Sequence, residues 1–320
     1  MVAVEKIGLR VSNALSNYGT IAILIGLTGI FAVAKPHEFL TVKNGFIMLQ
    51  QIAPLGLVSL GVTFLLAMRY YDLSIGYVVS LSGVVATTLF GNGFSEFTGI
   101  LTTIFLVGCL FGFVNGFIVT FLRVPPLVVT IGVGFMCYGV IYIITGGKAV
   151  FYGIPEHFGY WGSGMVWFVP VPVIIVAVIF AACYVALEKS SLGRYMYAIG
   201  NNETTSSLSG VNVKLVKMLG FLLCSSFSCM AGILIASENM VGHTTAGERY
   251  LLLGLTAAFL GTSTFRKGEG NLWGTLLGVL ILGIAYNGMT MVGVEYKWRE
   301  VITGSILIVA LAISSSKKGK

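Results

Sequence analysis

Charged residues are scarce in this sequence. Asp, Glu, Lys and Arg together make up 10% of its 320 residues, and Asp72 is the one aspartate among them. A soluble domain carries roughly 25% charged residues, because its surface has to be solvated by water. This scarcity therefore excludes a water-soluble globular protein. With 56% hydrophobic residues and a mean hydropathy of +0.93, the chain is expected to have lipid as its solvent.

Groups that catalyse reactions or bind metals are also rare. The three histidines (His37, His157 and His243) fall between the long apolar runs, and the five cysteines fall within them without a metal-ligand spacing. We interpret the cysteines as packing residues. The sequence contains no Gly-x-x-x-x-Gly-Lys-Ser/Thr phosphate-binding loop. No catalytic residue, no metal and no cofactor is therefore predicted for this chain.

What is abundant is apolar sequence in runs of about 20 residues, the length that crosses the hydrocarbon core as a helix. These runs predict an all-α, polytopic membrane protein of about ten transmembrane helices, or nine or eleven because the eighth and tenth runs are short. No linker breaks the pattern, so residues 1–320 are expected to form a single transmembrane domain. The runs are Tyr18–Ala34, Asn44–Met68, Leu73–Phe90, Phe97–Phe121, Pro126–Thr145, Val166–Leu187, Leu215–Ser237, Tyr250–Phe265, Leu272–Val292 and Val301–Ser314.

The orientation follows from the distribution of Lys and Arg between the loops. With a cytoplasmic N-terminus, thirteen of the nineteen basic residues lie on the inner side and six on the outer side. Inner loops of membrane proteins are enriched in Lys and Arg, so both termini are predicted to be cytoplasmic. The net charge of +7 then reflects topology and contact with anionic lipid headgroups, not binding to nucleic acid.

Polar residues within the runs are almost all uncharged. Proton-coupled carriers usually have ionisable groups inside the membrane, so their scarcity argues against that class. Uncharged polar groups suit the path of a neutral, hydroxylated solute. The alternative is that they bond neighbouring helices or their own backbone. The candidates for the translocation path are Gln50, Gln51, Thr63, Asn115, Thr130 and Asn287.

Two of these candidates have similar surroundings. Asn115 is the second-last residue of the stretch Leu110–Gly116 and Asn287 that of the stretch Ile281–Gly288, although the spacing from Gly to Asn differs by one residue. The predicted topology runs the two helices in opposite directions. This similarity indicates a possible inverted repeat with a site between its halves.

Four groups of residues together resemble a known family. They are Asp72–Gly76 with Leu81–Ala86, Asn115–Val119 with Arg123–Gly132, Gly193–Glu203 running on to Leu208–Val213, and Phe259–Ser263 with Gly268, Gly274–Gly278 and Asn287–Gly288. In order and spacing, the chain resembles the permease subunits of bacterial sugar ABC importers, the ribose-permease-like branch of a family that includes branched-chain amino acid permeases.

This resemblance implies a function and a set of partners. The chain is expected to form the translocation path for a sugar or sugar-like neutral solute as a multi-pass protein of the bacterial cytoplasmic membrane. A separate ABC ATPase would use ATP and Mg, a periplasmic sugar-binding protein would deliver the solute, and a second permease subunit, identical or paralogous, would complete the transporter. Membrane lipid is the remaining partner.

The resemblance also assigns the loop between the sixth and seventh runs to ATPase coupling. Asn202 is expected to cap a short helix there, with Glu203 near its positive N-terminus. Leu208 and Val211 would give the helix an apolar edge, and Gly210 would end it. The predicted coupling loop consists of Gly200, Asn201, Asn202, Glu203, Thr204, Thr205, Ser206, Ser207, Leu208, Ser209, Gly210 and Val211.

The sequence departs from the family pattern before the Asp-Leu-Ser motif, and rival functions stay open. Family members usually have glycines immediately before the Asp-Leu-Ser motif, whereas this chain has Arg69, Tyr70 and Tyr71. The main rival is a secondary carrier or facilitator that works without ATP, and a membrane scaffold or enzyme is another. The sequence does not identify the sugar.

Overall fold

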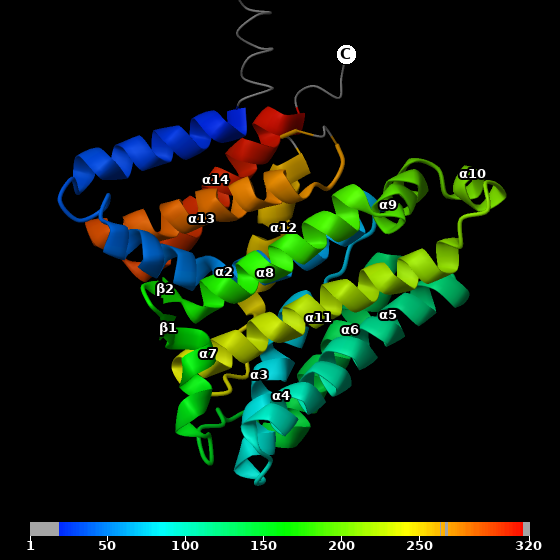
Figure 1. Cartoon of the computed structure of the whole chain (residues 1–320), viewed down its shortest axis with the longest axis horizontal. Coiled ribbons are helices and arrows are strands. Elements are labelled where there is room, and N and C mark those ends of the chain that lie inside the picture. Colours follow the sequence, from blue (N-terminus) through cyan, green and yellow to red (C-terminus); the bar gives the residue numbers. More distant parts are fainter. Residues whose placement is uncertain (1–18, 263, 266–267, 316–320) are drawn as a thin grey trace, which may run out of the picture. The chain divides into compact units, whose positions relative to one another are not determined.

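The structure is a computed structural model that describes residues 19–262, 264–265 and 268–315. Helices make up most of it (Figure 1). The long helices are Gly19–Ala34, α2 (Val42–Ala67), α3 (Ile75–Gly91), α6 (Pro126–Thr145), α8 (Val171–Tyr184), α11 (Val213–Asn239), α12 (Glu248–Thr262), α13 (Leu272–Val292) and α14 (Tyr296–Ser315), with one more built from α4 (Glu96–Thr103), the π-helical η1 (Ile104–Cys109) and α5 (Leu110–Phe121).

Short elements occupy the connections. They are the 3-10 turn η2 (Glu156–Phe158), α7 (Gly159–Ser163), the two-residue strands β1 (Met165–Val166) and β2 (Val169–Pro170), the π-helical η3 (Val185–Lys189), α9 (Ser191–Asn201) and α10 (Glu203–Leu208). The strands pair antiparallel. The prediction of an essentially all-helical protein is therefore confirmed for the described residues.

Six of the described helical segments are long and apolar enough to cross a membrane. They are Val42–Ala67, Glu96–Phe121, Pro126–Thr145, Val171–Lys189, Val213–Asn239 and Leu272–Val292, and Gly19–Ala34 and Ile75–Gly91 are shorter apolar helices. This confirms a polytopic membrane protein. The total of about ten spans and the inverted repeat stay predictions. Both termini lie outside the described residues, so their cytoplasmic location stays a prediction too.

The chain divides into two compact units. One comprises Met1–Ile52 and Thr256–Lys320, and the other comprises Ala53–Leu255. The backbone crosses between them within α2 and near residue 255, inside α12. The expectation that residues 1–320 form a single transmembrane domain stays a prediction.

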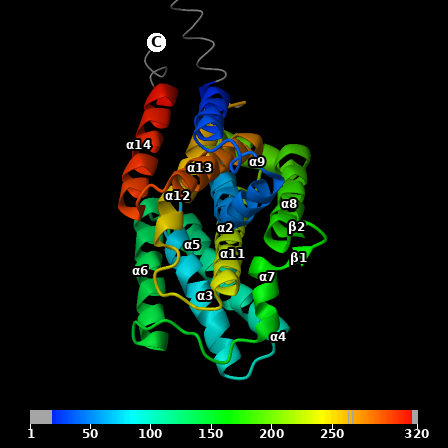
Figure 2. The ribbon, with the colours of Figure 1, turned by 90° about the vertical axis from the view of Figure 1, so that its left-hand side faces the viewer.

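In the unit Ala53–Leu255, α11 is the central helix. It packs against α3, α5 and η1 (Figure 1). A Cβ atom at Gly112 of α5 would lie 2.9 Å from the backbone of Leu222, so the small residue lets the two helices approach closely. Figure 2 shows α3, α6 and α11 aligned along roughly one direction. The cysteines of these helices, Cys137, Cys224 and Cys229, are buried as free thiols, in agreement with their predicted packing role.

The loops at one end of this unit converge. Tyr70, from the α2–α3 loop, donates a hydrogen bond to Glu203 of α10, and the ammonium group of Lys214 lies over the Phe121 ring at the end of α5. All of these positions were predicted to lie on the cytoplasmic side. The structure therefore gathers three predicted inner loops at one end.

The opposite end gathers the predicted outer loops. Val150 and Gly242 exchange two backbone hydrogen bonds of 3.0 and 2.8 Å. The Trp161 indole donates to Glu96 at 2.5 Å, and the Gly162 amide donates to the Ser237 hydroxyl at 2.7 Å. These contacts fasten the segment before α8 to the outer ends of α4 and α11.

The segment between α11 and α12 runs alongside α3. Gly242 packs beside Thr87 of α3, whereas the Gly247 amide donates to the Ser80 hydroxyl at 2.8 Å and Gly247 also packs against Gly76. Thr87 and Gly76 are separated by about 16 Å at the 1.5 Å rise of a helix. The segment 242–247 thus follows α3 into the bundle without helical structure, and α12 begins there. Because α12 begins only at Glu248, after this segment, the eighth apolar run is short.

In the other unit, small residues bring α12 and α13 together. Added Cβ atoms at Gly274 and Gly278 of α13 would overlap the backbone of α12 at Gly261 and Ala257. Asn44 and Asn287 exchange two amide hydrogen bonds of 3.1 Å. The Asn271 side chain caps α13 by accepting from the Gly274 amide at 2.7 Å. The Gly274/Gly278 pair therefore serves helix packing, as is typical of small residues four positions apart in a membrane helix.

Candidate functional site

The predicted coupling loop, residues 200–211, contains the last two residues of α9 and all of α10, and it lies at the end where the inner loops converge. The Ser190 hydroxyl caps α9 by accepting from the Leu192 amide at 3.1 Å. The Asn202 side chain caps α10 by accepting from the Thr205 amide at 2.9 Å. An Asn at this position satisfies one of the amides that a helix N-terminus leaves unpaired. The cap at Asn202 is as the sequence predicted.

The C-terminal end of α10 also follows the prediction. Gly210 has φ +86°, a left-handed conformation that glycine adopts without steric conflict. The Gly210 amide donates to Ser207 O and the Val211 amide to Ser206 O, each at 3.1 Å. This pair of bonds is the Schellman motif, which satisfies the last carbonyl groups of a helix. Both ends of α10 are therefore fixed by local hydrogen bonds.

The side chain of Leu208 projects from α10. Leu208 is 85% exposed, whereas Val211 is only partly exposed. Of the two residues predicted to give α10 an apolar edge, Leu208 is therefore the one that is mostly exposed. A large exposed apolar residue on a short, doubly capped helix is a suitable anchor for a partner protein.

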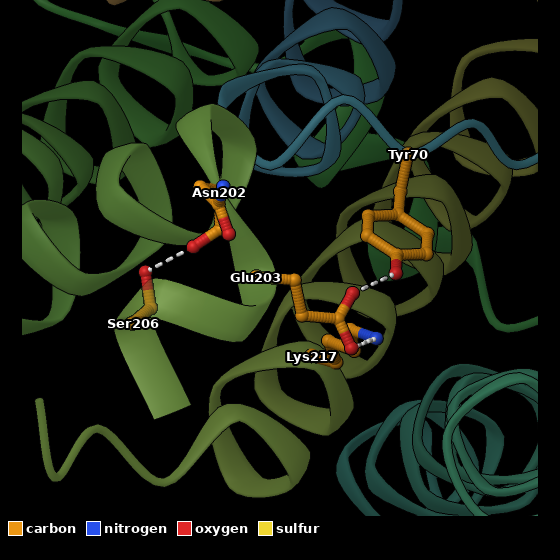
Figure 3. Close-up of polar contacts among 5 residues, drawn as sticks. All are labelled: Tyr70, Asn202, Glu203, Ser206 and Lys217. Carbon is orange, nitrogen blue, oxygen red and sulfur yellow. Dashed lines mark hydrogen bonds and ion pairs between the residues drawn. The ribbon is translucent and has the colours of Figure 1, made fainter. Parts of the chain in front are cut away.

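Glu203 makes two contacts that the sequence did not predict. Its carboxylate accepts from the Lys217 ammonium group of α11 at 2.5 Å and from the Tyr70 hydroxyl at 2.9 Å, one partner on each oxygen (Figure 3). The Lys217 ammonium also lies 4.9 Å from the centre of the Tyr70 ring. The three residues form a closed cluster, which we call the Glu203 cluster.

The electrostatics favour the charged form of Glu203. Partial burial raises the pKa of its carboxyl group, but the hydrogen bonds from Lys217 and Tyr70 and the charges of Lys217 and Arg123 outweigh that effect. The pKa therefore lies below its usual value. Partial burial raises the pKa of Tyr70, so its hydroxyl stays protonated and donates to the carboxylate.

Helix α9 also contacts the end of α2 directly. A Cβ atom at Gly200 would overlap the carbonyl oxygen of Ala67, the last residue of α2. The next residue, Met68, packs over Gly220 of α11. The pair α9–α10 therefore lies against two membrane helices, α2 and α11, and touches the segment between α2 and α3.

That segment begins with an unusual backbone conformation. Arg69 has φ +61°, and the Arg69 and Tyr70 amides donate to Leu66 O and Leu65 O at 3.0 and 2.9 Å. These bonds make another Schellman motif, at the position where glycine is preferred. The conformation places the Tyr70 ring 6.2 Å from the Phe221 ring of α11, in an edge-to-face arrangement. The departure from glycine noted in the sequence thus supplies Tyr70 to the Glu203 cluster.

The candidate path residues of this unit bond mainly to protein. The Asn115 amide donates to Asp72 at 3.2 Å and to the Ser74 hydroxyl at 2.9 Å. The Thr130 hydroxyl accepts from the Leu73 amide at 3.0 Å, and Thr63 donates to Ser59 O in its own helix at 2.7 Å. Asn115 and Thr130 therefore hold the Asp-Leu-Ser motif, a role that sequence reasoning missed. Their assignment to the path stays a prediction.

The remaining candidates lie at the start of α2 and on α13. Asn287 is buried and pairs with Asn44, as described above. Gln50 is partly exposed and Gln51 is exposed. Within the described residues, no group of three His, Cys, Asp or Glu side chains is arranged to hold a metal ion.

The chain matches a known family over most of its length. The family described as "Branched-chain amino acid transport system / permease component" matches residues 45–311. The ribose import permease protein RbsC of Escherichia coli is 32% identical over 301 residues, which cover 93% of each chain. That of Bacillus subtilis is 29% identical over 315 residues, covering 98% of this chain and 97% of the relative.

A relative with another named sugar matches over a similar length. The D-allose transport system permease protein AlsC of Escherichia coli is 28% identical over 296 residues, covering 92% of this chain and 90% of the relative. No solved structure matches the chain significantly. The chain belongs to the family of branched-chain amino acid transport system permease components.

Proposed function

We propose that this protein is the permease subunit of an ABC importer for a sugar or a sugar-like neutral solute in the bacterial cytoplasmic membrane. Its relatives are named as ribose and D-allose permease proteins and match it over nearly the whole chain. The observation that carries the proposal is α10 itself, a short helix fixed at both ends that exposes Leu208. An ATP-driven transporter needs such a rigid contact between its membrane helices and its ATPase.

The ATPase is proposed to dock on α10 and to be a separate polypeptide that uses ATP and Mg. The predicted coupling residues 200–211 would then form the permease side of this contact, with Leu208 inserted into the partner. The basic residues at the same end, among them Lys214 and Arg194, are consistent with a cytoplasmic location. By the same reasoning, both termini are proposed to be cytoplasmic.

A periplasmic sugar-binding protein is proposed to deliver the solute at the opposite end. Two segments are held together there, the one around Val150 and the one that begins at Gly242. A second permease subunit, identical or paralogous, would complete the transporter. About ten spans and an inverted repeat are proposed to form the translocation path.

The path is proposed to use uncharged polar groups and exposed backbone. The non-helical segment 242–247 beside α3 carries backbone amides and carbonyls into the bundle. Such backbone is tolerated at membrane depth where it is buried in protein or borders water. Hydroxyl and amide groups near it suit a sugar, which is neutral and forms many hydrogen bonds.

Reconstitution tests the proposal directly. The full chain is placed in lipid vesicles with the proposed ATPase and binding protein, and uptake of labelled D-ribose, D-allose and D-galactose is measured. At least one sugar is expected to accumulate only when ATP, Mg and both partners are present. Uptake at full rate by the permease alone would instead establish a carrier or facilitator.

A docking variant sharpens this test. Leu208→Asp introduces a charge at the proposed apolar contact, and a lost central contact of this kind weakens association by about tenfold or more. Retention of the ATPase during size-exclusion chromatography is therefore expected to fall. Leu208→Met is the matched control, because it keeps an apolar side chain of similar volume. Equal retention by both variants would exclude Leu208 as the anchor.

A further inference from the structure

We infer that the Glu203 cluster is the link that passes movement of α10 to the start of α3, with Tyr70 as a positioning residue for transport. This inference rests on the proposed function, in which an ATPase moves α10. It adds a route through the α2–α3 segment to the covalent route that leads from α10 into α11.

The contacts of Glu203 tie three elements to one carboxylate. Lys217 of α11 binds one oxygen at 2.5 Å, and Tyr70 of the α2–α3 segment binds the other at 2.9 Å (Figure 3). Hydrogen bonds in which one partner is ionised are shorter and stronger than neutral ones. Glu203 is the first residue of α10, directly after its capping residue Asn202. A displacement of α10 therefore acts on Tyr70 and Lys217 together.

The burial of Lys217 distinguishes the Glu203 cluster from an ion pair on the protein surface. The Lys217 side chain is 8% exposed, although that of Glu203 is 48% exposed. Solvent-exposed ion pairs contribute little, because water and salt screen them. Here the ammonium group lies over the Tyr70 ring, which in turn packs edge-on against Phe221. The cation is thus held by the ring as well as by the carboxylate.

Tyr70 connects this cluster to the membrane helices within four residues of chain. Asp72 and Ser74 bond to Asn115 of α5, and the Leu73 amide donates to Thr130 of α6. Helix α3 begins at Ile75, and its first residues are buried. The segment from Tyr70 to Ile75 is short and is hydrogen-bonded to both α5 and α6. It therefore cannot absorb a movement of Tyr70 by changing its own conformation freely. Movement of Tyr70 is therefore passed to α3 and its neighbours.

The residue type at position 70 supports this link. The resemblance described above places glycines immediately before the Asp-Leu-Ser motif, and glycine offers neither a ring nor a hydroxyl group. Tyr70 provides both. The left-handed conformation of Arg69 orients it, at a position where glycine would normally turn the chain.

The test measures coupling in the reconstituted full transporter, as molecules of labelled sugar taken up per ATP hydrolysed, with D-ribose, D-allose and D-galactose as probes. Tyr70→Phe removes the hydroxyl and keeps the ring. Loss of a hydrogen bond to a charged group is expected to lower this ratio about tenfold. ATPase retention on the permease should stay at the wild-type level, because α10 and Leu208 are unchanged.

Three further comparisons distinguish loss of the link from a general loss of transport function. Tyr195→Phe removes an exposed tyrosine hydroxyl from the neighbouring α9 and is expected to keep the wild-type ratio. Lys217→Arg preserves the positive charge and should stay near wild type, whereas Lys217→Met should lower the ratio. The double variant Tyr70→Phe/Glu203→Gln should lower the ratio of sugar uptake to ATP hydrolysis by a smaller factor than the product of the two single-variant factors. The reason is that both changes act through one cluster.

The outcomes distinguish this inference from the proposed function. If wild-type uptake requires ATP and Tyr70→Phe keeps the wild-type ratio, the link is wrong while the ABC permease proposal stands. Loss of ATPase retention in Tyr70→Phe would also overturn it, by making Tyr70 a docking or folding residue. If wild-type uptake needs no ATP, the proposed function itself fails.

Discussion

The Asn115 amide nitrogen lies 3.2 Å from a carboxylate oxygen of Asp72 and also donates to the Ser74 hydroxyl at 2.9 Å. Asp72 accepts two more hydrogen bonds, from the Ser74 amide and hydroxyl. Buried polar groups are stable when they are hydrogen-bonded in this way. The Asp-Leu-Ser motif therefore joins α5 to the start of α3, and Thr130 adds α6 to the same junction.

Thr130→Val tests that junction. The change keeps the shape of the side chain but removes the acceptor of the Leu73 amide, and an amide left without a partner costs about 1–3 kcal/mol. The midpoint of thermal unfolding in detergent should fall accordingly. Thr103→Val is the matched control, since the buried Thr103 hydroxyl donates only to Gly99 O in its own helix turn. Equal losses in both variants would contradict a special role for Thr130.

Arg69→Gly is expected to stabilise the protein. A left-handed conformation disfavours a residue with a Cβ atom by roughly 1–2 kcal/mol, and part of that gain is lost to the greater entropy of glycine in the unfolded chain. The expected gain is about 0.5–1 kcal/mol in unfolding free energy, measured by denaturant titration. Arg194→Gly, within α9, should destabilise by a similar amount. The same sign in both variants would contradict the strain at Arg69.

Asn202→Ala is expected to loosen α10 without unfolding the bundle. Loss of an Asn cap costs about 1 kcal/mol, and α10 is only six residues long. Hydrogen exchange at the Thr205 amide should accelerate by about fivefold to tenfold. In Asn212→Ala, which removes the cap of the 27-residue α11, amides in the middle of that helix should keep their protection, because packing holds them. Unchanged exchange at Thr205 would show that the cap does not stabilise α10.

The Glu203 cluster also has a pH dependence with a defined sign. The lowered pKa of Glu203 means that the folded protein stabilises the ionised carboxylate of this residue. The resulting stability is present above the usual pKa of a glutamate, about 4.3, and is lost as the pH falls through the lower folded value. The carboxyl carbon shift of Glu203, followed by NMR in labelled protein, should therefore titrate below that value.

Tyr70→Phe should move this titration to higher pH. The variant removes one of the hydrogen bonds that lower the Glu203 pKa, while Lys217 remains. Tyr195→Phe should leave the titration where it is. A Glu203 titration that does not respond to Tyr70→Phe would show that the hydroxyl does not donate to the carboxylate in the membrane.

Local features of the coupling loop were predictable from the sequence, because neighbouring residues determine them. Asn202 caps α10 and Gly210 ends it through bonds that span only a few residues. The partners of Glu203 were not predictable in this way. Tyr70 lies 133 residues before it and Lys217 lies 14 after it, so only the packing of α2 and α11 brings them together.

The course of the segment 242–247 was not predictable from the sequence either. Its composition is that of a surface loop, with Gly, His and Thr, and loops between apolar runs are normally outside the membrane. The Val150 and Ser80 contacts that draw it along α3 come from elements far away in the chain. Asn115 was rightly singled out as an unusual polar residue in a span, but its partner Asp72 becomes evident only when α3 and α5 are adjacent.

The sequence by itself determined that this is a helical membrane protein and that it resembles the permeases. These conclusions rest on charge content, the length of apolar runs and local motifs, which can be read from the chain without knowledge of its packing. Tertiary structure decided which polar groups meet, where α12 starts and what anchors Glu203. Those outcomes depend on helix packing, in which small residues allow close approach and buried polar groups have to find partners across the bundle.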